Sequence, residues 1–157
     1  VAGGYDPRLT ENVEHHLELE TLARKLDIID RTVFLRSITN DQRLLLLENT
    51  SILLYTPENE HFGIVPVEAM YMGAIVIACN SGGPLESVDH GKTGYLLPPN
   101  KEEWSNKIAR ILNSSQEEQE DMKAAAKDKV KRIFTFDVFA DQLDELLQRM
   151  VQEKFKQ

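Results

Sequence analysis

A run of five residues, Ala74–Ala78, is apolar at every position. Its length suits a strand, and a strand with two apolar faces is typical of a parallel sheet that is covered on both sides. Parallel strands need long crossover connections, which are usually helices. This run therefore predicts an α/β fold, in which helices cover both faces of a doubly wound parallel sheet.

The rest of the chain alternates between strand-like and helix-like segments. Short apolar stretches predict further strands at residues 1–2, 32–35, 51–55 and 94–97. Helical spacing and capping pairs predict helices at 11–27, 44–47, 64–71, 101–112 and 116–133, and a final amphipathic helix around 139–150. Asn40 is the predicted N-cap of the second helix. Because ligands of such sheets bind beyond the carboxyl ends of the strands, the candidate loops are 3–7, 36–40, 56–63 and 79–84.

Composition excludes several classes of protein. The net charge of −8 argues against a nucleic-acid binder, because neutralising phosphates needs a basic face. No apolar run approaches the ~20 residues of a membrane span, so we expect a soluble chain. The one cysteine, Cys79, allows no internal disulfide. The 157 residues suit one domain; since they begin with an apolar phrase and no Met, we interpret the chain as a fragment.

The stretch 59–70 carries two carboxylates, Glu60 and Glu68, with seven residues between them. Gly63 lets the backbone approach a ligand, and the helix that follows presents free N–H groups. Such a place suits a phosphate or a polyhydroxylated ring. The alternatives also stand: Glu68 as a surface acid on a helix flank, and Glu60 as an acid favoured by the helix macrodipole.

A second glycine-containing loop, Asn80–Glu86, follows the buried strand. Gly82 and Gly83 permit either close approach to a ligand or a tight turn. His61, in the first loop, is either a hydrogen-bonding group for sugar or phosphate or a structural residue of the loop. A dinucleotide-binding dehydrogenase is disfavoured, because no Gly-x-Gly-x-x-Gly sequence follows a strand.

The pattern of Glu60–Met70 followed by Gly82–Glu86 resembles the donor-binding half of retaining glycosyltransferases of family 4, and the resemblance covers essentially the whole chain. These enzymes have the GT-B fold of two facing Rossmann-like domains. The resemblance implies that residues 1–157 are the C-terminal, donor-binding domain, with a helical C-terminus, and that the N-terminal acceptor domain is absent from the chain. Residues 59–66 and 80–87 are similar to those of mannosyltransferases that extend a dolichol-linked oligosaccharide from GDP-mannose through α-1,3 and α-1,6 bonds.

The resemblance also implies a role for individual residues. Glu60 is the catalytic candidate, which contacts the transferred sugar near its anomeric centre, and Glu68 binds the ribose hydroxyls. Residues 62–64 hold the sugar and pyrophosphate through the backbone, and residues 36–38 pack the base, although Arg36 stands where the family commonly has glycine. The donor-binding positions besides Glu68 are Gly3, Gly4, Arg36, Ser37, Ile38, His61, Phe62, Gly63, Ile64 and Gly83.

Further implications concern cofactors and partners. Sugar transfer in the family needs no metal or other cofactor, and no Asp-x-Asp metal motif occurs in this sequence. The partners are a nucleotide sugar and, through the absent domain, a lipid-linked oligosaccharide at the cytosolic face of the endoplasmic reticulum. We predict that the chain by itself transfers no mannose and that its final helix makes it self-associate. Two alternatives stay open: a family member that uses a UDP-sugar, and a non-catalytic binding or scaffold module.

Overall fold

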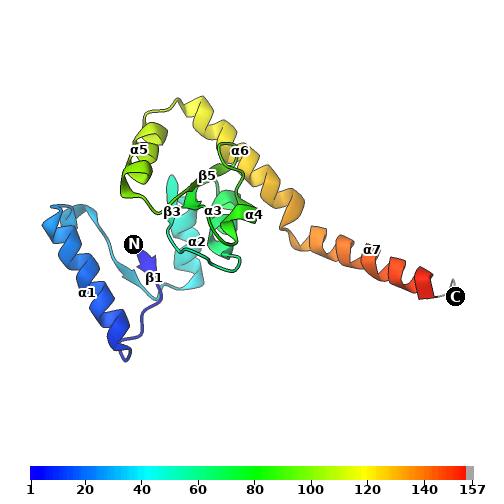
Figure 1. Cartoon of the computed structure of the whole chain (residues 1–157), viewed down its shortest axis with the longest axis horizontal. Coiled ribbons are helices and arrows are strands. Elements are labelled where there is room, and N and C mark those ends of the chain that lie inside the picture. The colour runs from blue at the N-terminus through cyan, green and yellow to red at the C-terminus, as the bar shows by residue number, and fades with distance from the viewer. Residues whose placement is uncertain (155–157) are drawn as a thin grey trace. The chain divides into compact units, whose positions relative to one another are not determined.

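A computed structural model describes residues 1–154 of the chain (Figure 1). The chain divides into two compact units, Val1–Leu45 and the residues from Leu46 onward. Each unit is described by itself.

The first unit combines one helix of 16 residues with short elements. It contains β1 (Ala2–Gly3), α1 (Thr10–Lys25), a single 3-10 turn η1 (Ile29–Arg31) and β2 (Leu35–Arg36). β1 and β2 pair in parallel, with Ala2 opposite Leu35. Among residues 1–45 only Ala23 is buried. Ring contacts add to the packing of this unit: the His16 ring lies edge-on to Tyr5 at 5.6 Å and to Phe34 at 5.5 Å.

Two local predictions in this part of the chain are wrong. The strand expected at 32–35 forms later, as β2, because Thr32 closes the turn after η1: its hydroxyl donates to the Ile28 carbonyl at 2.8 Å. The helix α2 (Asn40–Glu48) is capped by Thr39 instead of Asn40. Gln42 N–H donates to Thr39 Oγ1 at 3.3 Å, and Thr39 N–H donates to Gln42 Oε1 at 3.0 Å. This reciprocal pair is a capping box, which satisfies two N–H groups at once.

The second unit contains a three-stranded parallel sheet. Its strands are β3 (Ile52–Tyr55), β4 (Ile75–Cys79) and β5 (Gly94–Leu97), with β4 in the middle. Ile52 lies opposite Ile75, and Val76 lies opposite Gly94. All five residues of β4 are buried, as its apolar sequence predicts.

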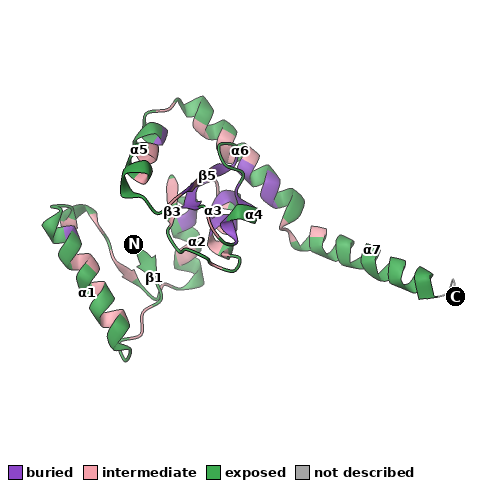
Figure 2. Ribbon diagram, in the orientation of Figure 1, coloured by how far each residue is buried: buried purple, intermediate pink, exposed green. Residues whose placement is uncertain are grey.

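Helices cover both faces of this sheet (Figure 2). On one face, Val76 and Ala78 join a buried cluster with residues of α3 (Ile64–Met72) and α6 (Gln116–Ile133). On the other, Ile75 and Ile77 pack with Ile111 of α5 (Lys101–Leu112). The predicted α/β class, with parallel strands and helices on both sides, is confirmed. A four-residue helix, α4 (Pro84–Ser87), lies between β4 and β5 in the sequence.

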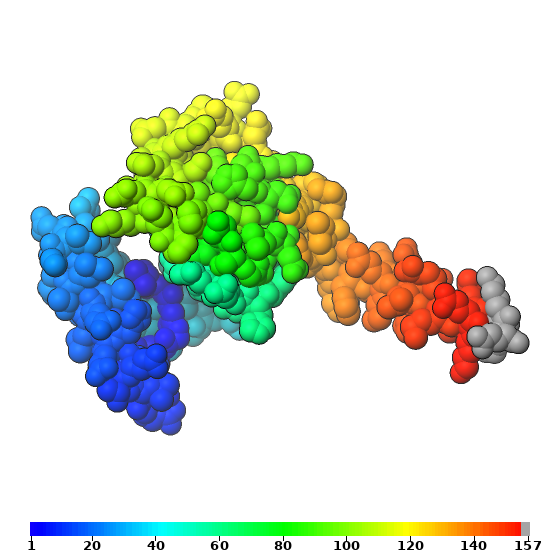
Figure 3. Space-filling view, viewed as in Figure 1, coloured from blue at the N-terminus to red at the C-terminus, as the bar shows by residue number. Residues whose placement is uncertain are grey.

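The C-terminal part is helical, as predicted. Asn100 caps α5 by accepting from the N–H groups of Glu102 and Glu103, at 2.9 and 3.2 Å. Ser115 caps α6 by accepting from Glu118 N–H at 3.1 Å. The last helix, α7 (Phe136–Lys154), has no buried residue among those described. Its atoms are orange to red in Figure 3, and its exposed apolar side chains include Phe139, Leu143, Leu146, Leu147 and Met150.

Candidate functional site

Two loops follow the carboxyl ends of the neighbouring strands β3 and β4. We call residues 56–63 and 80–83 the paired loops, because hydrogen bonds join them directly. Gly83 N–H donates to the Glu60 carbonyl at 2.8 Å, and Asn59 N–H donates to Ser81 Oγ at 3.1 Å. The sequence places both loops beside the sheet edge where ligands bind, but it does not show that they hold each other.

Gly82 and Gly83 are needed for this contact between the loops. Gly82 has a φ of +60°, and a Cβ there would overlap the backbone of Glu60. A Cβ at Gly83 would overlap the backbone of Phe62. The close approach that the two glycines permit is therefore an approach of one loop to the other. The proposed contact of Gly83 with the donor stays a prediction.

Cys79 joins the start of the first loop to the end of β4. Its thiol donates to the Thr56 carbonyl at 3.2 Å, and its side chain is buried, as predicted. Burial raises the pKa of this thiol, and the Glu58 carboxylate raises it further. The thiol therefore keeps its proton and its role as donor.

Gly63 ends the first loop in a left-handed conformation, with a φ of +70°. Tyr55, the last residue of β3, lies against it: a Cβ at Gly63 would be 2.8 Å from the Tyr55 hydroxyl oxygen. Burial raises the pKa of the Tyr55 phenol, and the negative charge of Glu60 raises it further. The Glu60 carboxylate is therefore close enough to Tyr55, and so to Gly63, for its charge to affect the Tyr55 phenol. Tyr55 is not among the residues predicted from the sequence, where its place at a strand end is its only signal.

The loop backbone itself orients the Glu60 carboxylate. His61 N–H donates to Glu60 Oε1 at 3.2 Å, and Glu60 is half-buried while His61 is exposed. The next residue, Phe62, packs its ring edge-on against Phe134 at the end of α6, with 5.8 Å between the ring centroids. The paired loops are therefore anchored to α6 as well as to the sheet.

The start of α3 provides unpaired backbone donors next to these loops. Gly63 is the N-cap residue, and no side chain caps the helix. The first N–H groups of an uncapped helix lack intrahelical partners, and the macrodipole favours negative charge there. Glu68 lies in the second turn of α3 and is half-buried. Because it follows Ile64 by four residues, both lie on the same side of the helix.

The first unit holds the other predicted positions. Ser37 N–H donates to the Gly3 carbonyl at 2.9 Å, and its hydroxyl donates to the Tyr5 carbonyl at 2.9 Å. The Arg36 guanidinium lies over the Tyr5 ring at 4.8 Å. A cavity of about 230 Å³ adjoins this turn. No atom lies within 4 Å of where a Cβ would be at Gly3 or Gly4, so packing does not require glycine at either position.

The predicted residues thus form two groups. In the first unit these are Gly3, Gly4, Arg36, Ser37 and Ile38; in the second they are Glu60, His61, Phe62, Gly63, Ile64, Glu68 and Gly83. Among residues 1–154, no group of three or more His, Cys, Asp or Glu side chains is placed to hold a metal ion.

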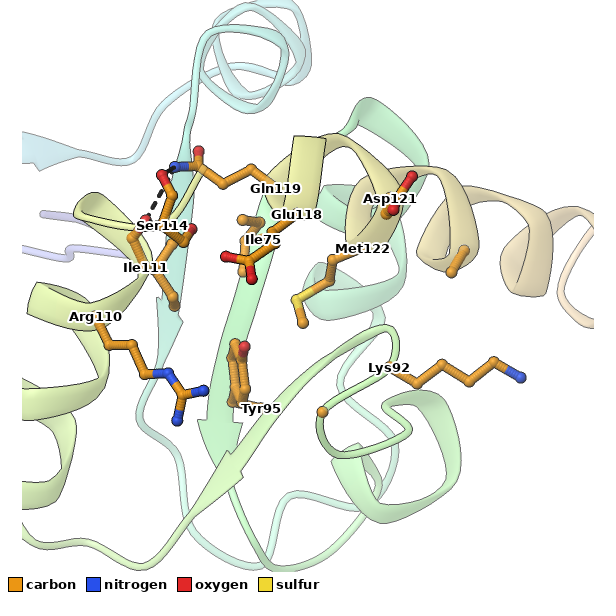
Figure 4. Close-up of a pocket in the computed structure, with 12 residues that line it drawn as sticks. Ile75, Lys92, Tyr95, Arg110, Ile111, Ser114, Glu118, Gln119, Asp121 and Met122 are labelled. Atoms are coloured by element: carbon orange, nitrogen blue, oxygen red, sulfur yellow. Dashed lines mark hydrogen bonds between the residues drawn. The ribbon is translucent and has the colours of Figure 1, made fainter. Parts of the chain in front are cut away.

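A separate cavity of about 460 Å³ lies at the opposite, amino-terminal end of β4 and β5 (Figure 4). Its lining includes Ile75, Tyr95, Arg110, Glu118 and Met122, and none of the predicted site residues.

In the part of the chain that the structure describes, no helix has both the length and the apolar character needed to cross a membrane.

The chain is similar to known proteins over most of its length. The chain is 46% identical to Alpha-1,3/1,6-mannosyltransferase ALG2 of Homo sapiens over 91% of its length, and 44% identical to the Mus musculus protein of that name over 96%. It spans only about a third of these relatives, 34% and 36% of their lengths.

The fold is also similar to that of solved glycosyltransferases. Anabaena HepE, solved in complex with UDP and glucose, superposes with a TM-score of 0.81 and 26% identity, over 93% of this chain and 39% of HepE. The family model described as glycosyl transferases group 1 matches residues 1–129, which include the paired loops, Glu60 and Glu68. The chain therefore belongs to the glycosyl transferases group 1 family.

Proposed function

We propose that this chain is the donor-binding part of a retaining mannosyltransferase that uses GDP-mannose. The observation that carries the proposal is the 46% identity to a human protein named as an α-1,3/1,6-mannosyltransferase, over 91% of the chain. Within the chain, the paired loops and the uncapped start of α3 form the region whose geometry suits a sugar diphosphate.

In this proposal, the start of α3 binds the pyrophosphate of the donor. Gly63 and Ile64 stand at a helix end that no side chain caps, where the first N–H groups have no partner within the helix, and no acidic side chain occupies the first turn. These N–H donors and the helix macrodipole stabilise the negative charge that develops on the leaving diphosphate. Metal independence is part of the proposal, and unchanged activity of the whole protein in the presence of EDTA would support it.

The two glutamates have separate roles in this proposal. Glu60 contacts the transferred mannose near its anomeric carbon, and Glu68 accepts hydrogen bonds from the ribose hydroxyls. The half-buried positions of both carboxylates support these roles, because hydrogen bonds are stronger where water is partly excluded. Backbone groups of Phe62 hold the sugar, and His61 hydrogen-bonds it. Contact of residues 36–38 with the base completes the assignment.

The acceptor and the cellular location belong to the whole protein. We infer that the whole protein transfers mannose to a lipid-linked oligosaccharide, through α-1,3 and α-1,6 bonds, at the cytosolic face of the endoplasmic reticulum. The name of the mammalian relatives supports both linkages. Protease accessibility of the tagged whole protein in sealed microsomes tests the location.

A UDP-sugar is the second candidate donor. The specific observation in its favour is the similarity to Anabaena HepE, which was solved with UDP and glucose, at 26% identity and a TM-score of 0.81. The much higher identity to the mannosyltransferases favours GDP-mannose.

An NMR titration of the isotope-labelled chain with GDP-mannose, GDP and UDP-glucose tests the donor. We expect shifts at Gly63, Glu68 and Gly83 with the two guanine nucleotides alone. Equal shifts with UDP-glucose would retain the family and exclude the GDP-mannose assignment. No shift with any of the three, together with the formation of a stable protein complex, would favour the scaffold alternative.

Two substitutions separate the roles of the glutamates. Glu68→Ala removes charge-assisted hydrogen bonds, so it should weaken GDP-mannose binding by about 1.5–3 kcal/mol. Glu117→Ala, on the exposed face of α6, is the matched control and should leave the Kd unchanged. In the whole protein, Glu60→Ala should lower kcat more than it weakens binding. Equal binding by the Glu68→Ala and Glu117→Ala variants would assign Glu68 a structural role.

Self-association of this chain remains a prediction. It is supported by the apolar side chains that α7 exposes, such as Phe139 and Leu147, at 58% and 50%. Sedimentation at increasing concentration should show dimers or larger species, and a monomer at every concentration would contradict it.

A further inference from the structure

We propose that Lys129 of α6 is a positioning residue for the paired loops, and thereby for Glu60. This inference rests on the proposed function for its effect on donor binding. The effect on the loops themselves can be measured without any ligand.

The first observation is the burial of Lys129. Within residues 1–154 it is the only charged residue that is buried, with 7% of its surface exposed. Removing an ammonium group from water costs several kcal/mol unless partners compensate. Lysine is almost never buried without such partners, so what Lys129 contacts indicates its role.

One partner of Lys129 lies in the last turn of α4, and the other lies two residues beyond its end. Its Nζ donates to the Glu86 carbonyl at 3.1 Å and to Asp89 Oδ1 at 2.8 Å. The last carbonyls of a helix have no partner within it, and Lys129 supplies one for the Glu86 carbonyl. Lys129 therefore fixes α4 to α6, across 43 positions of sequence.

A short series of hydrogen bonds leads from Lys129 to the candidate catalytic residue. Glu86, whose carbonyl Lys129 binds, donates its own N–H to the Gly83 carbonyl at 2.9 Å. Gly83 in turn donates to the Glu60 carbonyl at 2.8 Å. A shift of α4 would thus move Gly83, and Glu60 with it.

The end of α6 contacts the first of the paired loops directly. Phe134, five positions beyond Lys129, packs edge-on against Phe62. This helix therefore anchors α4 through the Lys129 side chain and the first of the paired loops through an aromatic contact at its end. The ion pair is the more specific of the two anchors, because its donor has defined acceptors at hydrogen-bond distance.

The test compares Lys129→Met with Lys123→Met in the complete chain. Lys123 is the matched control, because it lies on the same helix and pairs with an exposed residue of that helix, Glu120, at 2.9 Å. Amide hydrogen exchange reads the loops directly: for Lys129→Met we expect exchange at Gly83 to accelerate about tenfold more than at Ile77 of β4. For Lys123→Met we expect no such difference. Equal acceleration at Gly83 and Ile77 would mean general destabilisation and would overturn the proposal.

Donor binding provides the second measurement. We expect Lys129→Met to raise the Kd for GDP-mannose about tenfold, since misplaced binding groups lose affinity without being removed. Lys129→Arg, which keeps the charge, should restore most of the affinity. A Kd equal to that of Lys123→Met would contradict the link to the donor site. If the unmodified chain itself binds no GDP-mannose, the proposed function fails, and the exchange experiment still decides the positioning role.

A second variant covers the case in which Lys129→Met does not fold. Asp89→Asn keeps the lysine and its bond to Glu86 but removes the ion pair. We expect a smaller, local acceleration of exchange at Gly83, and exchange unchanged there would overturn the proposal.

Discussion

The two units of this chain hold their turns in different ways. In the first unit, the turn at Gly3–Tyr5 is held by Ser37 and by aromatic rings, and only Ala23 is buried. In the second, the paired loops extend from a sheet whose middle strand is buried at every residue. The carboxylates of Glu60 and Glu68 are thus supported by a packed core, whereas the Gly3–Tyr5 turn depends on a few polar and ring contacts.

The largest expected difference between the units concerns core packing. Met70 of α3 is fully buried, and Met70→Ala should lower the free energy of unfolding of the second unit by about 2–5 kcal/mol. Leu17→Ala in α1 removes a side chain that is 55% exposed and should cost less than about 0.5 kcal/mol. Urea unfolding followed by circular dichroism measures both. An equal loss of free energy of unfolding in the two variants would show that Leu17 is packed more tightly than its exposure indicates.

A glycine in each unit sharpens the comparison. Gly83→Ala places a methyl group against the backbone of Phe62, so it should cost about 1–3 kcal/mol or more. Gly4→Ala places it in open space and should change stability by less than about 0.5 kcal/mol. Thermal unfolding of the two variants measures the difference. A tolerated Gly83→Ala would mean that the paired loops separate easily.

The first unit should also be easier to stabilise. Leu9 occupies the N-cap position of α1 without any side-chain hydrogen bond, and it is 55% exposed. Leu9→Asp supplies an acceptor for the first N–H groups and should stabilise α1 by about 1 kcal/mol. Hydrogen exchange along residues 10–25 measures the gain. Exchange as fast as in the parent chain would indicate that α1 is limited by packing and not by its cap.

The smallest effect concerns charge beside the paired loops. Glu60→Gln removes one of the two causes that raise the pKa of Tyr55 above 10.0, so this pKa should fall while burial keeps it raised. A raised pKa means that Tyr55 stabilises the folded state below pH 10 and loses this contribution as pH rises through its folded value. NMR titration of labelled tyrosine measures the shift. An unchanged Tyr55 pKa would place the Glu60 charge farther away.

The sequence predicts what depends on local spacing. The buried strand β4 follows from five apolar residues, and the caps at Asn100 and Ser115 follow from acids placed three residues later. Thr39 forms a capping pair with Gln42 in the same way, so the predicted cap at Asn40 is wrong by one residue.

The remaining features depend on contacts between distant residues. Nothing in the sequence spacing joins Gly83 to Glu60, Lys129 to Glu86, or Tyr55 to Gly63. The candidate site could therefore be located by its loops and glutamates, but its support could not. A single sequence indicates which residues are suitable for the chemistry, whereas only the fold shows what holds them.

The interlocked backbones of the paired loops have a consequence for chimeric proteins. The backbones of Glu60 and Phe62 leave no space for a Cβ at Gly82 and Gly83, so the conformation of each loop depends on that of the other. If residues 56–63 alone were exchanged between family members, the new loop would have to pack against a second loop from a different protein. Donor preference should therefore transfer between relatives only when both loops are exchanged together, as one inherited module.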